Sequence, residues 1–551
     1  MTHRPALRLL LIFTVGLGLV LPTVSMLRGA AAPAPGPVTA TPLHKSGIYD
    51  LGEKAGWTLT ATPGVPTPAG DFTYTVKTNN AAVIKTGTFS LASGSATIEV
   101  TPNEPAMLYV QITPPPAATP AAPAGGGARA GGAGQFAPAA AAPLPTIEAL
   151  KTTLTLTEAQ AAAIQPLLDD VTKARAEMLD RQTTLTLLST ALGGRITPLL
   201  TEAQRPQLVQ VLTPAPRGGG GGGGARGGGG GLTLGAAIAP TKIQPGTPRP
   251  ADFDAFWEGK LAELAKIPIN PVLTPTPTNK EGVEFYTVML DSVGSHVQGY
   301  LAKPAREGKF PAIIQFQYAG VYALSPASSQ DRAAEGWLAF NVDSHDIAPS
   351  VGTGAPGNYN SLGNTDRETS YFLNMYLRDA RAVDYIRSRP DWDGKTIVFQ
   401  GISMGGQQSL ATAGLRPNDV TAVLVLVPSG ADIAGSLHGR TAGYPNWGTN
   451  DPKVAATAPY FDTINFASRI KAPVLLAMGF LDTIAPPVGN WTVLNQIPGP
   501  KEAVPLVDAA HNNQSTAQQL APYENRAKEV RDLILHGGTF KPNAATSRPS
   551  M

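Results

Sequence analysis

A serine flanked at two residues' distance by glycines is the feature of this sequence with the clearest chemical meaning. Residues 401–405 read Gly-Ile-Ser-Met-Gly, which is the pattern G-x-S-x-G. The pattern carries chemistry where it follows a strand and opens a helix, because a serine on that strained turn exposes its hydroxyl and only glycines let the backbones pass closely. We predict a strand at 396–399 and a helix from 407 to 414, so Ser403 is predicted to be a nucleophile.

A serine nucleophile needs a base to take its proton, and histidine is the usual one. Where the serine lies on such a turn, the acid and then the histidine follow it along the chain. Three histidines follow Ser403. His438 lies in a polar, glycine-rich stretch, and His536 ends a predicted helix at 523–535, where a surface or capping role suits it. His511 follows the apolar run 503–507 by a short loop, and we predict that it is the base.

The acid is expected at the end of the preceding strand. Asp482 stands four residues after the predicted strand 474–478, within the run Gly-Phe-Leu-Asp-Thr at 479–483. Its predicted role is to hold the tautomer of His511 and to stabilise the imidazolium that forms during attack. Two rivals are Asp508, which stands too near His511 on one strand to orient it, and Asp462, which reads as the start of a helix.

Attack on a carbonyl also needs two N–H donors aimed at the developing negative charge. One is expected to be the backbone N–H of Met404, the residue directly after the nucleophile. The other is expected in the loop after the predicted strand 312–317, and we assign it to the backbone N–H of Tyr318. The alternative for Tyr318 is an aromatic ring that packs on the domain. These groups imply neither a metal nor an organic cofactor.

Residues 248–545 contain the elements that would position these groups. Strand-like apolar runs alternate with helical patterns, which indicates an α/β domain with a parallel sheet covered on both faces. Besides those already given, the expected strands are 284–290, 297–302, 338–342 and 422–427, and the expected helices are 252–264 and 366–389.

The first part of the chain has a different pattern. Five short segments with β-branched and aromatic residues, bounded by Pro, Gly and Asn, lie between residues 57 and 113. They predict a small antiparallel sandwich of immunoglobulin-like size, preceded by an Ala/Pro linker at 33–42. No catalytic constellation is visible in it.

Two low-complexity tracts, 114–145 and 218–231, enclose a helical pattern at 146–212. The tracts are too poor in apolar residues to fold. The sequence Leu-Thr-Glu-Ala-Gln occurs at 156–160 and again at 200–204, and each Thr is a candidate helix N-cap. Because a strand-like run at 232–238 follows, we infer that 114–231 is a helical hairpin inserted into a sandwich made of 33–113 and 232–243. The alternative is a separate bead between two domains.

The first 32 residues have the features of a secretory signal peptide. Basic residues precede an apolar run at 9–21, and small residues follow at 30–32. The apolar run is shorter than the roughly 20 residues of a membrane span, although an uncleaved anchor is the alternative. We therefore expect a secreted or periplasmic protein without a stable membrane span once the signal is cleaved.

Composition excludes several classes of function. The 551-residue chain has no cysteine, which rules out disulfides, thiolate nucleophiles and cysteine-ligated metals. Its formal net charge is only +2, which argues against a nucleic-acid partner.

Over residues 248–540 the chain resembles the acetyl xylan esterase/cephalosporin C deacetylase family of α/β-hydrolases. Four stretches carry the resemblance. They are the predicted helix at 248–264, the segment that leads to the Ser403 turn (376–386 with 393–395), the run Pro-Tyr-Phe-Asp at 459–462 with Asn-Phe-Ala at 465–467, and the stretch around Asp482 at 479–487. It implies an α/β-hydrolase fold, Ser403, Asp482 and His511 as the triad, and the N–H groups of Tyr318 and Met404 as oxyanion donors.

The chain departs from the family pattern in two places. Met404 replaces the usual Gln after the serine, which leaves a backbone donor unaffected. The family's Arg-Gly-Gln is replaced by His345-Asp346-Ile347, so the substrate preference and the oligomeric state stay open.

Together these features predict a secreted serine esterase that removes acetyl or other short acyl groups from sugar hydroxyls through an acyl-enzyme. Its partner would be an acetylated oligo- or polysaccharide. The alternatives are a serine hydrolase of another specificity, such as a peptidase or a different carbohydrate esterase, and a non-catalytic carbohydrate-binding protein on a hydrolase scaffold.

Overall fold

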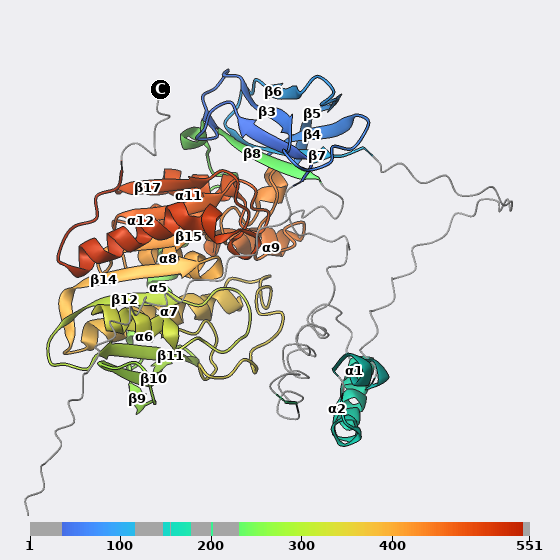
Figure 1. The fold of residues 1–551 in the computed structure, drawn as a ribbon. Helices are drawn as coiled ribbons and strands as arrows, with labels where there is room; N and C mark the ends of the chain where they lie inside the picture. The colour runs from blue at the N-terminus through green and yellow to red at the C-terminus, as the bar shows by residue number, and fades with distance from the viewer. Residues whose placement is uncertain (1–35, 116–146, 155, 178–199, 202–230, 544–551) are drawn as a thin grey trace, which may run out of the picture. The chain divides into compact units, whose positions relative to one another are not determined.

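The computed structural model describes residues 36–115, 147–154, 156–177, 200–201 and 231–543 (Figure 1). The chain divides into two compact units, one made of residues 1–117 with 222–551 and one of residues 118–221. The expected signal peptide, nearly all of both low-complexity tracts and the expected helical residues 178–199 and 202–212 lie outside the described residues. Within the described ranges, no helix combines the length and the apolar character needed to cross a bilayer.

A nine-stranded mixed sheet forms the centre of the larger unit, in the order β17-β16-β15-β14-β12-β13-β11-β10-β9 (Figure 1). Strands β12 to β17 are parallel, whereas β9, β10 and β11 run antiparallel to their neighbours. The expectation of a wholly parallel sheet is therefore wrong at one edge. Only Val293 and Gly294 separate β10 from β11, and so short a connection joins antiparallel strands. The bounds are β9 Val272–Pro275, β10 Val283–Ser292, β11 Ser295–Pro304, β12 Phe310–Phe316, β13 Leu338–Val342, β14 Trp392–Ile402, β15 Ala422–Leu426, β16 Val474–Gly479 and β17 Lys501–Leu506.

Helices cover both faces of this sheet. Alternate residues of each strand enter different cores: Phe399 and Val425 pack with α7, α8 and α11, whereas Val398 and Leu424 pack with α12. Burial on both faces explains why these strands are continuous apolar runs. The helices are α5 Phe253–Ala265, α6 Ala327–Glu335, α7 Tyr371–Ser388, α8 Met404–Leu415, α9 Pro452–Thr457, α10 Thr463–Ala467, α11 Pro487–Gln496 and α12 Ala517–Leu535.

A second, smaller part of the same unit consists of two sheets that share one core. Trp57, Leu59 and Ile98 of the three-stranded sheet pack with Phe72 and Val110 of the five-stranded sheet. We call these strands, β1 to β8, the sandwich. The three-stranded sheet contains β1 Val38–Pro42, β3 Ala55–Ala61 and β6 Ser95–Val100; the five-stranded sheet contains β2 Ile48–Tyr49, β8 Leu232–Ile238, β7 Ala106–Thr113, β4 Phe72–Thr78 and β5 Ala82–Phe89.

Two features of the sandwich bear on the sequence-based expectations. The prediction of a linker at 33–42 is wrong for residues 38–42, which form β1 and pair with β3. The β-branched residues Val38, Thr39 and Thr41 favour a strand there, which the Pro and Ala content of the segment concealed. Strands β7 and β8 are antiparallel neighbours, from Ala106 opposite Ile238 to Ile112 opposite Leu232. Residues 114–231 therefore separate two strands that pair with each other.

The described part of the smaller unit contains α1 Ile147–Leu154 and α2 Glu158–Glu177. Thr157 caps α2 as expected: its hydroxyl accepts from the N–H of Gln160, and the side chain of Gln160 accepts from the N–H of Thr157. Leu150, Ile164 and Leu168 are buried. The second copy of the repeated motif lies outside the described residues from 202 onward.

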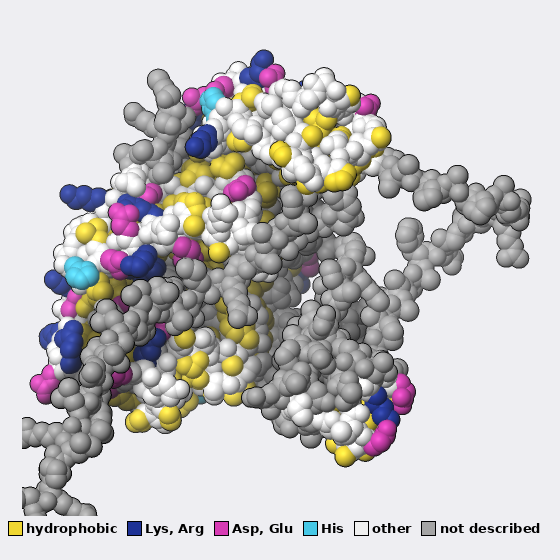
Figure 2. Space-filling model, viewed as in Figure 1, with side chains coloured by type: hydrophobic (Ala, Val, Ile, Leu, Met, Phe, Trp, Pro, Cys, Tyr) yellow, Lys and Arg dark blue, Asp and Glu magenta, His cyan; other side chains and the backbone are white. Residues whose placement is uncertain are grey.

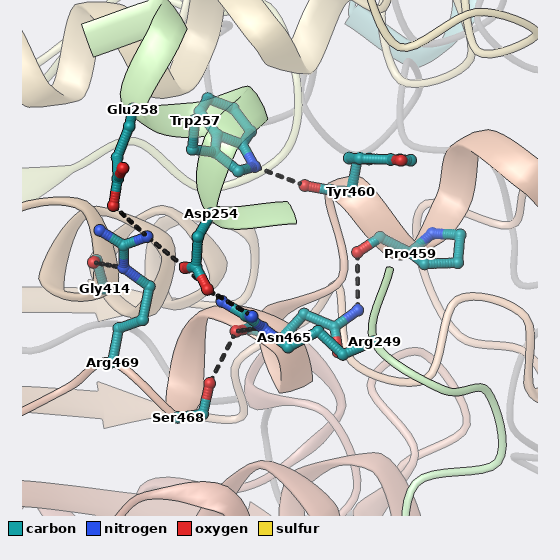
Figure 3. A network of polar contacts seen from close by, with 10 residues as sticks. All are labelled: Arg249, Asp254, Trp257, Glu258, Gly414, Pro459, Tyr460, Asn465, Ser468 and Arg469. Carbon is teal, nitrogen blue, oxygen red and sulfur yellow. Dashed lines mark hydrogen bonds and ion pairs between the residues drawn. The ribbon is translucent and has the colours of Figure 1, made fainter. Parts of the chain in front are cut away.

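An ionic network ties the first helix of the α/β part to the helix that follows Ser403 (Figure 3). Asp254 of α5 accepts from both Arg249 and Arg469, and Arg469 also donates to the carbonyl of Gly414 near the end of α8. Chiefly because of the hydrogen bonds from Arg249, the pKa of Asp254 falls to about 2. Asn465 joins the same network: its carbonyl accepts from Nε of Arg249, and its side-chain amide donates to the carbonyl of Pro459. The network therefore fixes α5 and α10 against the end of α8.

The face drawn in Figure 2 carries basic and acidic side chains interspersed with one another. Ion pairs also occur within α12, where Lys528 pairs with Asp532 and Arg526 with Glu529. Charges of opposite sign therefore lie close together on this face.

Candidate active site

Ser403 occupies the turn between β14 and α8 with a backbone conformation that is rare for a residue with a side chain. Its φ is 54° and its ψ is −122°, and such strain persists only where the surrounding structure holds it. The N–H of Ser403 donates to the carbonyl of Leu426 at 3.0 Å, and its own carbonyl accepts from the N–H groups of Gln407 and Ser429. Hydrogen bonds thus hold the peptide groups on both sides of Ser403.

The two glycines of the motif are sterically required. A Cβ atom on Gly401 would lie 2.1 Å from the carbonyl oxygen of Gly405, and one on Gly405 would lie 2.3 Å from that of Phe316. The first glycine closes the turn. The second allows the end of β12 to lie directly against the start of α8, which brings the loop after β12 beside the serine.

Hydrogen bonds join Ser403, His511 and Asp482 in one chain. His511 Nε2 lies 2.9 Å from Ser403 Oγ, and His511 Nδ1 lies 2.7 Å from Asp482 Oδ2. A carboxylate can only accept, so Nδ1 carries the proton and Nε2 is free to accept the proton of the serine. The side chains of His511 and Asp482 are 5% and 0% exposed, which keeps water from competing for these bonds.

Two backbone groups orient the carboxylate of Asp482. Its Oδ1 atom accepts from the N–H groups of Ile484 and Ala485, both at 2.8 Å. With Oδ1 occupied in this way, Oδ2 is directed at the histidine. The loop that follows β16 therefore sets both the position and the rotation of the carboxylate.

The rival residues have other partners. Asp462 caps α10 and accepts from the N–H of Ile464, and burial raises its pKa to about 7. Asp508 is exposed. The Nε2 atom of His438 lies 3.0 Å from the hydroxyl of Thr247, and His536 bonds to a carbonyl at the end of α12.

The structure also brings the two expected oxyanion donors next to the elbow. Met404 is the first residue of α8, where backbone N–H groups have no partner within the helix. Tyr318 follows β12, and the carbonyl of its neighbour Gln317 accepts from the side chain of Gln408 in α8 at 2.8 Å. Tyr318 is 46% exposed. Its ring stacks on that of Tyr322, which agrees with the alternative of an aromatic ring that packs on the domain and leaves the role of the Tyr318 N–H a prediction.

Sequence reasoning missed the side chains that hold the loop of Tyr318. The N–H of Gly320 donates to the hydroxyl of Tyr359 at 2.7 Å, and the carbonyl of Gly320 lies 3.1 Å from Nε2 of His345. A carbonyl only accepts, so Nε2 of His345 is the donor and its Nδ1 accepts from the hydroxyl of Tyr371 at 2.8 Å. Burial, helped by the charge of Arg378, lowers the pKa of His345 to about 4, which keeps the ring neutral.

A further tyrosine links this loop to the start of α8. The hydroxyl of Tyr444 lies 3.1 Å from that of Tyr359 and 3.2 Å from the sulfur of Met404. The only sequence signal for any of these residues was the triplet at 345–347, which differs from the family pattern. Tyr359 and Tyr444 stand in long loops without periodicity, so no local pattern could have identified them.

Comparison with known proteins relates the α/β part to one family. The sequence model of the acetyl xylan esterase (AXE1) family matches residues 241–435 and 444–527. A curated relative, acetyl esterase Axe7A of Xylanibacter ruminicola, is 33% identical over 283 residues, which cover 48% of this chain and 64% of the relative. The aligned part thus spans less than two thirds of the relative's length.

Two solved structures are similar to this chain at lower sequence identity. An acetyl xylan esterase from Paenibacillus sp. R4 is 24% identical with a TM-score of 0.47, covering 53% of this chain and 96% of that one. Acetyl xylan esterase 1 from Thermoanaerobacterium sp. JW/SL YS485 is 23% identical with a TM-score of 0.44, covering 52% and 97%. Because the family match takes in more than half of the residues, the chain belongs to the acetyl xylan esterase family.

Proposed function

We propose that this protein is a secreted serine esterase that hydrolyses acetyl esters of carbohydrates. The hydrogen-bonded chain from Ser403 through His511 to Asp482 is the observation that carries the proposal. Membership of the acetyl xylan esterase family and the name of the curated relative, an acetyl esterase, support the acyl group and the substrate class.

The geometry supports a two-step reaction. As Ser403 Oγ attacks the ester carbonyl, His511 Nε2 takes the hydroxyl proton, and the N–H groups of Met404 and Tyr318 stabilise the oxyanion. Collapse of the tetrahedral intermediate breaks the bond to the sugar oxygen, which receives the proton from His511. Water then attacks the acyl-Ser403, with His511 again as base, and releases acetate. Asp482 keeps the proton of His511 on Nδ1 throughout the first attack.

The loop beside the serine suits a ring-shaped leaving alcohol. The stacked rings of Tyr318 and Tyr322, whose centroids are 4.6 Å apart, form an aromatic surface next to the oxyanion position. Half of the Tyr318 side chain is open to solvent, so a sugar can approach it without displacing core residues.

Acetate release from acetylated xylan and from acetylated monosaccharides tests the proposal, with a series of p-nitrophenyl esters for acyl length and a peptide amide as the competing substrate class. We expect short acyl esters to be hydrolysed and Ser403→Ala to lose both activity and labelling by a fluorophosphonate. Ser388→Ala is a matched control, because the hydroxyl of Ser388 only bonds to a carbonyl at the end of α7. Amide hydrolysis in preference to esters, or full activity of Ser403→Ala, would refute the proposal.

We also propose the domain division 33–113 with 232–243 as an immunoglobulin-like sandwich, 114–231 as an insertion, and 248–545 as an α/β-hydrolase catalytic domain. The pairing of β7 with β8 supports the insertion, and the parallel strands around the elbow support the catalytic fold. Export rests on the signal-like residues 1–32, and mass spectrometry of the extracellular or periplasmic protein tests it through the mass of the mature N-terminus.

A further inference from the structure

The sandwich contacts the two loops that carry Asp482 and His511. Phe480, two residues before Asp482, is 1% exposed and belongs to the same hydrophobic core as Ile48, Met107 and Ala237 of the sandwich. The contact involves backbone as well as side chain. A Cβ atom on Gly235 of β8 would lie 2.8 Å from both Cβ and the carbonyl oxygen of Phe480, so β8 leaves no free space against the acid-bearing loop.

A second glycine of the sandwich lies against both loops. A Cβ atom on Gly47 would lie 2.9 Å from Val507 Cγ1 and 3.2 Å from Phe480 Cε2. Val507 opens the loop that leads to His511. Gly47 is itself attached to β8, because its carbonyl accepts from the N–H of Ala237 at 2.8 Å. The residue before β2 and the strand β8 therefore form one surface for the acid-bearing and base-bearing loops.

The two loops are hydrogen-bonded to each other where the sandwich touches them. The N–H of Phe480 donates to the carbonyl of Leu506 at 3.0 Å, and that of Leu481 donates to the carbonyl of Ala509 at 2.9 Å. A displacement of Phe480 is thus transmitted both toward Asp482 and toward His511.

A separate contact reaches the loop of Tyr444. The N–H and the hydroxyl of Thr441 donate to the carbonyls of Asn79 and Asn80, at 3.1 and 2.9 Å. These two residues form the turn between β4 and β5, and Asn79 is fixed to β7 because its N–H and its Oδ1 bond to the backbone of Met107. Tyr444, three residues after Thr441, lies against Met404 and Tyr359.

From these contacts we propose that the sandwich is a positioning element of the esterase site: its packing on Phe480 and Val507 holds Asp482 and His511 in register for proton transfer. This rests on the proposed function. The role differs from that of a spacer or of a carbohydrate-binding module, either of which leaves turnover on a small soluble ester unchanged when its packing is disturbed.

A methyl group added at the contact tests the proposal in the full-length chain. Gly235→Ala places the new atom against the backbone of Phe480, and Gly235 is not among the glycines with positive φ. Gly87→Ala is the matched control: it adds a methyl group to β5 of the same sandwich, 2.6 Å from the hydroxyl oxygen of Tyr74. We measure kcat and KM for p-nitrophenyl acetate well below each variant's unfolding midpoint.

We expect Gly235→Ala to lower kcat about tenfold with KM changed less than about twofold, because small misplacements of catalytic groups cost this much or more. Gly87→Ala is expected to keep kcat within about twofold whatever its loss in melting temperature. The proton NMR signal of the Nδ1–H···Oδ2 bond of the triad gives an independent readout, which we expect to shift or broaden in Gly235→Ala alone.

Equal kcat values for the two variants, or an unshifted triad proton in Gly235→Ala, would overturn the proposal. Should Gly235→Ala fail to fold, Val507→Ala gives the second test: it removes the two methyl groups that lie against Gly47, and an unchanged kcat in this variant counts against the proposal. Wild-type hydrolysis that is lost in Ser403→Ala establishes the proposed function separately, so failure of either idea can be distinguished.

Discussion

Replacing Asp482 by Asn is the sharpest test of how the triad is built. The Oδ1 atom accepts from two backbone N–H groups at 2.8 Å, so the Asn carbonyl must take that place, because an amide NH2 group there would face two donors. The NH2 group of Asn then points at His511 Nδ1. As a donor it is compatible only with an unprotonated Nδ1, so the ring proton moves to Nε2.

With its proton on Nε2, His511 donates to Ser403 instead of accepting from it, and the serine has no base. The same change in a Ser-His-Asp triad lowers kcat about 10⁴-fold, which corresponds to roughly 5 kcal/mol of transition-state stabilisation. We expect a loss of this order on p-nitrophenyl acetate, with slow fluorophosphonate labelling. Little change in melting temperature is expected, because the shape of the side chain is kept.

The matched control is Asp508→Asn, which changes the other carboxylate near His511 in sequence. Asp508 is exposed and bonds to Gln519 through its backbone carbonyl, so its kcat is expected to stay within about twofold of wild type. The reasoning is refuted if Asp482→Asn keeps more than about a tenth of the wild-type kcat, or if Asp508→Asn shows the larger loss.

Three further changes test the supporting structure. Gly405→Ala places a Cβ atom 2.3 Å from the carbonyl oxygen of Phe316. We expect the free energy of unfolding, measured by urea denaturation, to fall by about 1–3 kcal/mol and kcat to fall as well. A variant with unchanged stability and kcat would contradict the steric argument. In the folded protein the pKa of His345 is lowered from 6.5 to about 4, so between these pH values the unfolded chain binds more protons than the folded one. The free energy of unfolding should therefore fall by about 3 kcal/mol as the pH drops from 6.5 to 4. His345→Gln should remove this pH dependence, and stability–pH curves that run parallel for the variant and the wild type would contradict the prediction. Asp254→Asn should lower the free energy of unfolding by only about 1 kcal/mol at pH 7, because half of the carboxylate is exposed and its ion pairs are screened by solvent. The kcat should not change. The difference in stability between variant and wild type should vanish as the pH falls from 3.8 to 2, where the carboxylate of the wild type becomes protonated.

Local patterns were sufficient to predict the elements around Ser403. The elbow, the apolar runs of β14 to β17 and the helix after the serine each depend on residues close together in the chain. Since the carboxyl ends of parallel strands meet at one edge of the sheet, the order Ser403, Asp482, His511 already predicted which three residues could come together. The antiparallel edge and β1 were missed, because one follows from a two-residue turn and the other lies in a segment whose Pro and Ala content resembles a linker.

The sequence alone determined the family, and it predicted the type of nucleophile and the loops in which its partners lie, because these depend on short motifs and on strand order. Only the tertiary structure decided which atom of Asp482 faces the histidine, which side chains hold the loop of Tyr318, and that Gly47 and Gly235 lie against the acid-bearing and base-bearing loops. Such contacts join residues that are from 25 to several hundred positions apart in the chain. They produce no periodic pattern in the sequence, so only the folded structure reveals them.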